Sequence, residues 1–180
     1  MSEFAQHFIA HLQNLQERDR GAMAVLRRSL GFEPGSYPPA YPYVERFVEA
    51  ERHARDASRL ALYLTAGLYA LHPRQGTSSL ASSLGEVMRR RDSASIEQRF
   101  IALLGADAEN LAVYLRQVVS LLAADDRPLD YSLLLRDLSV WLNPRVDAER
   151  RDAVRQRWAR DFYRALTASA AGAPEHAVND

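Results

Sequence analysis

The sequence contains no cysteine among its 180 residues. This absence excludes disulfide scaffolds, thiol nucleophiles and cysteine-ligated zinc or iron–sulfur sites, and it fits a reducing cytosol. The first ten residues carry acidic Glu3 and no basic residue, so they do not look like an export signal. The longest apolar run, Leu60 to Leu71, is too short to span a bilayer. We therefore predict a cytoplasmic protein that is neither exported nor embedded in a membrane.

Lysine is also absent, so all 23 basic residues are arginine. Two explanations account for the exclusive use of arginine. A GC-rich genome favours arginine codons, and the planar guanidinium binds phosphate bidentately and stacks on bases. The 23 acidic residues bring the formal net charge to zero. A free-standing nucleic-acid-binding domain is usually basic overall. Any surface for nucleic acid must therefore be local.

Glycine and proline are scarce, with eight of each, and no segment alternates apolar and polar residues with a period of two. Apolar residues instead recur at spacings of three and four, which indicates helices. With 47% hydrophobic residues the chain can bury a full core. We predict an all-α fold, a two-lobed helical bundle of about eight to nine helices. The helices are expected near residues 4–15, 20–30, 43–53, 60–71, 77–91, 95–105, 108–124, 133–142 and 147–166.

Several of these boundaries rest on specific residues. Five prolines and glycines between Glu33 and Pro42 exclude a helix there. Ser95 with Gln98 has the spacing of a capping box, which would open the helix that follows. The polar break at 92–98 is the expected boundary between an N-terminal lobe (residues 1–91) and a C-terminal lobe (92–168). Residues 169–180 are small, polar and aperiodic, and are expected to form a disordered tail.

No catalytic centre is evident. Nucleotide-binding P-loops need the lysine that this chain lacks, and neither GxGxxG nor GxSxG occurs. His7 and His11 have a metal-ligand spacing but no third ligand, so surface positions are favoured. His53 and His72 are expected at helix ends, and Asp125–Asp126 in a solvated loop. We predict no enzymatic activity, no metal and no cofactor.

The arginines cluster locally. Residues 18–30 hold four arginines and one acidic residue (+3), and residues 133–164 hold eight and five (+3). Residues 105–130 hold two and five (−3). On the last predicted helix, Arg150, Arg157, Arg160 and Arg164 form a basic ridge away from an apolar stripe. Aromatic residues on apolar stripes are expected in the core: Tyr114, Trp141, Trp158 and Phe162.

Five stretches between residues 17 and 166 carry a family resemblance: ERDRGAMAVLRRSLG from Glu17, LYALHP from Leu68, RFIALLGADAENLAVYLRQVVSLLA from Arg99, YSLLLRDLSVW from Tyr131 and QRWARDFY from Gln156. In this order and spacing they resemble the CasB family. This family is the small subunit of Cascade, the type I-E CRISPR surveillance complex.

The resemblance implies a non-enzymatic, two-lobed helical protein, present in two copies beside the backbone and large subunits of the complex. There it would help to hold the target and displaced DNA strands of the R-loop. It also implies that basic residues of the shared motifs contact DNA. Together with the ridge residue Arg160, the candidates are Arg20, Arg27, Arg28, Arg99, Arg116, Arg136 and Arg157.

Two other functions remain open. A structural helical adaptor would use its arginines in salt bridges to partner subunits. A helical transcription regulator would need a helix-turn-helix, which the proline-rich segment after Leu30 argues against. Because Arg27, Arg116 and Arg157 are predicted to lie off the apolar stripes, we expect their truncation to leave folding intact.

Overall fold

The computed structural model describes residues 2–168, and the predicted tail at 169–180 lies outside this range. The described chain is all-α, as predicted, and contains no β-sheet. Its α-helices are α1 (Ser2–Arg18), α2 (Arg20–Ser29), α3 (Tyr41–Val44), α4 (Ala57–Leu71), α5 (Leu80–Arg91), α6 (Ala94–Leu104), α7 (Leu111–Ala124), α8 (Tyr131–Trp141) and α9 (Ala148–Thr167). Two 3-10 turns, Pro38–Ala40 and Glu45–Phe47, flank α3.

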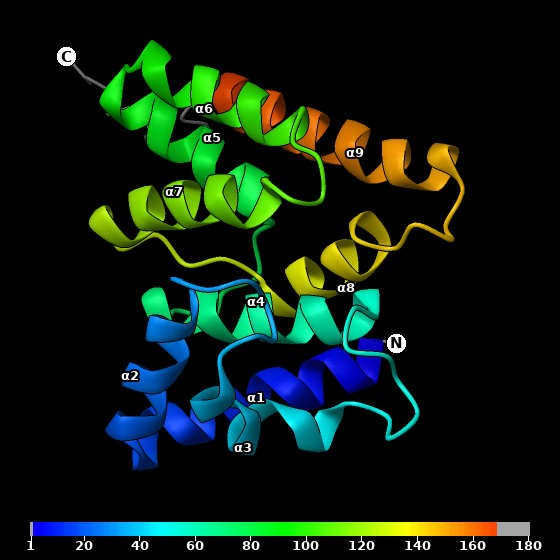
Figure 1. Cartoon of the computed structure of the whole chain (residues 1–180). Helices are drawn as coiled ribbons and strands as arrows, with labels where there is room; N and C mark the ends of the chain where they lie inside the picture. Colours follow the sequence, from blue (N-terminus) through cyan, green and yellow to red (C-terminus); the bar gives the residue numbers. More distant parts are fainter. Residues whose placement is uncertain (1, 169–180) are drawn as a thin grey trace, which may run out of the picture.

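The helices form two tiers (Figure 1). The lower tier holds α1 to α4 together with α8, and the upper tier holds α5, α6, α7 and α9. The sequence order is therefore crossed: α5 packs along α9, while α8 packs against α1 and α4. The predicted boundary at 92–98 stays a prediction, and these contacts cross it.

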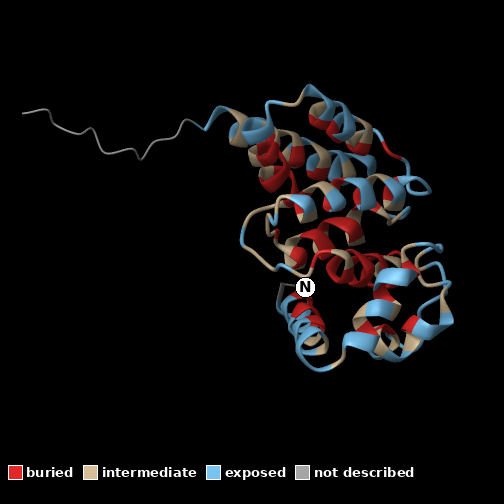
Figure 2. Cartoon of the chain, turned by 90° about the vertical axis from the view of Figure 1, so that its left-hand side faces the viewer, coloured by how far each residue is buried: buried red, intermediate tan, exposed pale blue. Residues whose placement is uncertain are grey.

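The central helix is α4, as its apolar character predicts. Residues 61–70 are all buried, and the side chain of Asp56 caps the helix by accepting a hydrogen bond from the Ser58 N–H. A Cβ at Gly67 would lie 2.7 Å from a methyl group of Leu30, so the glycine lets α2 approach closely. Gly85 of α5 does the same for α9, since its Cβ would meet the Phe162 carbonyl at 2.5 Å. Figure 2 shows the buried residues on the inner faces of the helices. No helix in residues 2–168 is long and apolar enough to cross a membrane.

Three predicted boundaries are wrong. The segment expected to lack helix contains a 3-10 turn and the start of α3, because Pro42 lies in the first turn, where a missing N–H costs nothing. In place of the helix expected up to His53, α3 ends at Val44 and a 3-10 turn continues to Phe47. Ser95 does not open α6: the helix begins at Ala94 after Ser93, and Ser95 lies in its first turn.

A buried arginine organises the irregular segment before α4. Arg59 donates from Nε to Glu45 Oε1 at 2.9 Å and from a terminal nitrogen to the Ala54 and Gly35 carbonyls at 3.1 and 3.3 Å. Tyr63 donates its hydroxyl to the same Glu45 oxygen at 3.0 Å. The segment is thus fixed to α4 by polar contacts.

Two connectors between the tiers run side by side. Gly76 N–H donates to the Leu129 carbonyl at 2.8 Å, and Asp130 N–H donates to the Ser78 carbonyl at 2.8 Å. Gln75 and Leu129 form an isolated parallel bridge. The link from α4 to α5 and the link from α7 to α8 are therefore joined to each other.

Candidate nucleic-acid interface

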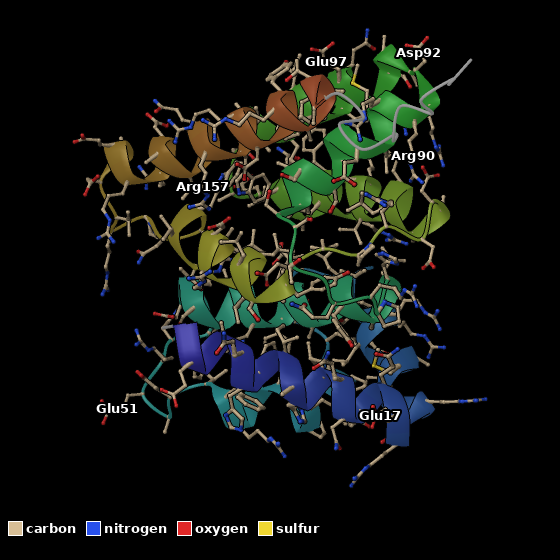
Figure 3. The ribbon with its side chains drawn as sticks, turned by 180° about the vertical axis from the view of Figure 1, so that it is seen from behind. Glu17, Glu51, Arg90, Asp92, Glu97 and Arg157 are labelled. Atoms are coloured by element: carbon tan, nitrogen blue, oxygen red, sulfur yellow. The ribbon has the colours of Figure 1, made fainter. Side chains whose placement is uncertain are left out.

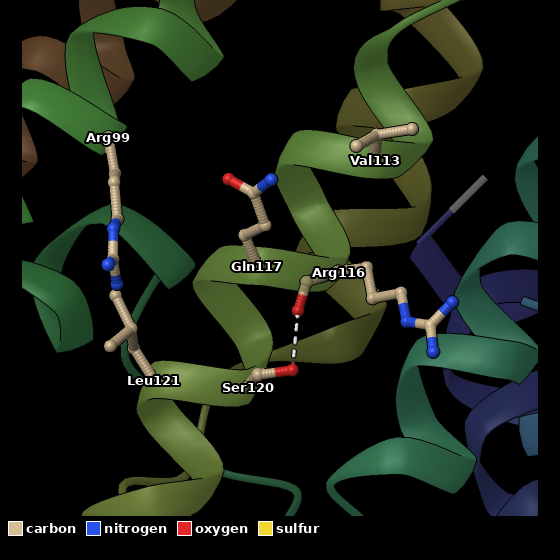
Figure 4. A pocket seen from close by; sticks show the side chains of 6 residues that line it. All are labelled: Arg99, Val113, Arg116, Gln117, Ser120 and Leu121. Atoms are coloured by element: carbon tan, nitrogen blue, oxygen red, sulfur yellow. Dashed lines mark hydrogen bonds between the residues drawn. The ribbon is translucent and has the colours of Figure 1, made fainter.

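A groove of about 600 Å³ lies between α6 and α7 and contains two of the predicted arginines. α6 contributes Arg99, and α7 contributes residues spaced three and four apart along one face. In Figure 4, Arg99 and Arg116 lie on either side of this exposed face of α7. The remaining lining residues are Val113, Gln117, Ser120 and Leu121.

Arg116 also connects the groove to α2. One of its terminal nitrogens donates to the Leu30 carbonyl at 3.4 Å, and Leu30 is the C-cap of α2. The last turn of α2 carries Arg27 and Arg28, both exposed. The Arg116 bond therefore connects α7 to the end of α2, although the two are far apart in the sequence. Arg20 lies in the first turn of α2, at the far end of that helix from Leu30.

The arginines of the groove and of the last turn of α2 have no acidic partner among the described residues. Within residues 2–168, no ion pair involves Arg27, Arg28, Arg99 or Arg116. By contrast, Asp125 at the end of α7 pairs with both Arg90 and Arg91. An exposed guanidinium without a carboxylate neighbour keeps its donors available for phosphate.

Arg157 does not fit the expectation for a free surface arginine. A terminal nitrogen of its guanidinium is bonded to Asp137 Oδ1, and Trp158 Nε1 donates to Asp137 Oδ2 at 2.7 Å. Figure 3 shows Arg157 between α9 and α8. Burial raises the pKa of Asp137, while the bonds from Arg157 and Trp158 oppose that shift. This side chain therefore links α9 to α8, a contact that the position of Arg157 off its own apolar stripe did not predict.

The other two candidates lie elsewhere. Arg136 is half-buried on α8 of the lower tier, beside a small crevice that also contains Phe4 and Leu62. Arg160 is exposed on α9 and has no ion pair among the residues that the structure describes. The eight candidate arginines thus do not form a single site: Arg99 and Arg116 line one groove, and Arg116 also contacts the end of α2.

The histidines and acidic residues have structural positions. His11 Nε2 lies 2.9 Å from the Tyr43 carbonyl, and burial lowers its pKa. His72 is the C-cap of α4 as predicted, and its Nε2 lies 2.7 Å from the Arg127 carbonyl. His53 lies in the segment before α4 rather than at a helix end. In the described part of the chain, no three acidic or histidine side chains come together as a metal site.

Of the predicted core aromatics, Trp141, Trp158 and Phe162 are buried, as expected, and Tyr114 is half-buried. Sequence reasoning missed Val113 and Gln117 as groove residues. The available signal was their spacing from Arg116 on the face of α7 opposite Leu115 and Leu122.

Comparison with known proteins places these features in a family. The family model described as CRISPR-associated protein Cse2 matches residues 22–163. A curated CRISPR-associated protein Cse2 from Thermus thermophilus is 43% identical over 162 residues, covering 88% of this chain and 89% of the relative. The chain belongs to the Cse2 family. Seven of the eight candidate arginines lie inside the matched range, and Arg20 lies just before it.

Cse2-family structures share the fold. The crystal structure of CasB from Thermus thermophilus is 42% identical with a TM-score of 0.74, covering 88% of this chain and 97% of that one. The M. ruber CasB structure is 34% identical with a TM-score of 0.71, covering 91% and 94%. A chain of a CRISPR RNA-guided surveillance complex has a TM-score of 0.76 at 24% identity, covering 92% and 94%, and at that identity it shows a common fold alone. The resemblance to CasB seen in five stretches of sequence is thereby confirmed.

Proposed function

We propose that the protein is a non-catalytic small subunit of a type I-E Cascade complex. In this role it binds the target and displaced DNA strands through arginine and stabilises the R-loop during antiviral defence in the cytoplasm. Its partners would be the backbone and large subunits and a second copy of itself. The observation that carries the proposal is the α6–α7 groove, in which Arg99 and Arg116 are exposed and have no acidic partner within residues 2–168.

Formation of an R-loop is close to balanced in free energy. Guide pairing replaces one duplex by another of similar stability, so modest contacts to the separated strands shift the exchange forward. Each strand is a polyanion, and a guanidinium that binds a phosphate releases condensed counterions. The groove offers no aromatic stacking platform, since its lining beyond the arginines is Val113, Gln117, Ser120 and Leu121. This composition favours contacts to the sugar–phosphate backbone over reading of bases.

The alternative is a structural adaptor that bridges other subunits. Val113 favours it, because this residue is 55% exposed and lines the same groove as the arginines. In an adaptor, Val113 would meet a partner protein and the arginines would pair with its carboxylates.

The test is the double variant Arg99→Ala with Arg116→Ala in assembled complexes, with salt titrated. Two lost contacts to a single strand should make the slope of log K against log salt shallower by about 1.4, which is about 25-fold weaker binding at 0.1 M salt. The charge-matched control is Arg74→Ala with Arg89→Ala, two exposed arginines outside the groove. It should keep the wild-type slope.

Retention of the variant in the complex is measured in parallel, together with protection of each strand. Normal retention with lost protection supports strand binding. If the complex protects both strands like wild type across the salt range, the proposal fails. If retention falls while the protein that stays bound protects normally, the adaptor gains.

A further inference from the structure

A second basic groove lies at the opposite end of α4 from Leu30. It has a volume of about 230 Å³ and is formed by the segment 52–57 and by residues 143–145 of the connection from α8 to α9. In Figure 1 both segments lie at the edge of the molecule where α4 begins. Ala57, which lines this groove, precedes Gly67 by ten residues, or about 15 Å of helix. Leu30, which accepts the Arg116 bond, packs at Gly67, so the two grooves are separate sites.

The hydrogen-bond acceptors in this second groove are already occupied. His53 Nδ1 accepts from the Arg55 N–H at 3.1 Å, and Asn143 Oδ1 accepts from the Arg145 N–H at 2.9 Å. Asp56 accepts from the Ser58 N–H at 3.0 Å and from Arg52 at 3.4 Å. At the N-terminus of α4, the Asp56 side chain occupies the Ser58 amide.

The groups of this groove that stay available to a ligand are hydrogen-bond donors. The guanidinium groups of Arg55 and Arg145 are exposed and take part in no ion pair within the described residues. Since His53 Nδ1 is an acceptor, a neutral His53 carries its proton on Nε2, which is a donor. Asn143 likewise keeps its amide NH₂ group. Arg52 adds little net charge, because Glu49 at 2.7 Å neutralises it.

We propose that this groove binds backbone phosphate of nucleic acid, as a second contact separate from the α6–α7 groove. The inference rests on the proposed function and assigns it a further site. Two guanidinium groups and neutral N–H donors in the same groove match the oxygens of a phosphodiester. A protein partner fits less well, since an interface core is apolar and aromatic-rich and only Ala57 and Pro144 here are apolar.

The experiment uses the double variant Arg55→Ala with Arg145→Ala in the full chain. The backbone bonds that position His53 and Asn143 remain, because the substituted residues donate them through main-chain N–H groups. Binding to a fluorescein-labelled single-stranded DNA oligonucleotide is measured across salt concentrations, for the chain alone and in the assembled complex. We expect the slope to become shallower by about 1.4 and binding at 0.1 M salt to weaken about 25-fold.

The Arg74→Ala with Arg89→Ala control removes the same charge and should keep wild-type binding. If the Arg99 and Arg116 variant weakens binding while the Arg55 and Arg145 variant matches the control, the second groove is overturned and the proposed function stands. If both variants bind like the control, both proposals fail. If the Arg55 and Arg145 variant dissociates from the complex with DNA binding unchanged, the groove docks an acidic protein surface and the phosphate proposal is overturned.

Discussion

The junction of α8 and α9 and the groove between α6 and α7 both contain arginine, but they differ in the origin of the opposing charge. At the junction, the fold supplies it: Asp137 is buried and bonded to Arg157 and to Trp158. In the groove, no carboxylate faces Arg99 or Arg116 among the residues described. Arginines that position helices have internal partners, whereas arginines left without them are available to a ligand. Whether an arginine has an internal carboxylate partner therefore depends on residues of neighbouring elements, and not on its own helix.

The largest effect should come from breaking the junction. Asp137→Ala leaves the Trp158 N–H without its acceptor and Arg157 without its counter-charge, so we expect a loss of about 3 kcal/mol in the free energy of unfolding, at the low end for buried pairs because Arg157 is partly exposed. Urea denaturation measures it. Asp152→Ala is the matched control: its pair with Arg155 is exposed and should contribute about 0.5 kcal/mol. Equal losses in the two variants would contradict the comparison.

A smaller effect is expected where a carboxylate caps a helix. Asp56→Ala should cost about 1 kcal/mol at pH 7 through loss of the α4 cap. Hydrogen bonds from Ser58 lower the pKa of Asp56. The stabilisation is therefore present above the unfolded value of about 3.9 and is lost as pH falls through the folded value. Urea denaturation from pH 7 to 3 should show the two proteins converging at the acidic end. A gap that stays constant with pH would instead indicate lost packing.

The smallest effect should come from the groove. Arg99→Ala with Arg116→Ala removes no ion pair within residues 2–168 and one long bond to the Leu30 carbonyl. The free energy of unfolding should change by no more than about 0.5 kcal/mol. Thermal or urea denaturation tests this. A loss above about 1.5 kcal/mol would mean that these arginines hold the tiers together, and the distinction between the two regions would disappear.

Helical periodicity was sufficient for the long elements, since α4 and α7 to α9 bury the apolar stripes that the sequence predicts. It failed at α3, where proline is compatible with a first turn, and at Ser95, where the polar residues Asp92 and Ser93 already precede the helix. Prediction of the site failed for a different reason. A helical projection places Arg157 away from its own apolar stripe but contains no information on Asp137, twenty residues earlier on another helix.

The sequence alone also could not predict the α6–α7 groove. The family resemblance named Arg99 and Arg116 separately, and no sequence pattern indicates that α6 and α7 line one groove or that Arg116 contacts the end of α2. The second groove depends on even more distant segments, since residues 52–57 and 143–145 are about half the chain apart. Both grooves are formed by tertiary contacts between separate segments of the chain.

The crossed order of the helices has a consequence for synthesis on the ribosome. α1 and α4 need α8 to cover them, and α5 needs α9, which ends at Thr167. When residue 91 has been made, the apolar faces of all three early helices still await partners that come later in the chain. At about 5–20 residues per second, the 76 residues from 92 to 167 take roughly 4–15 s to appear. During that interval the nascent chain presents apolar helix faces to solvent, which makes it a natural client for ribosome-associated chaperones.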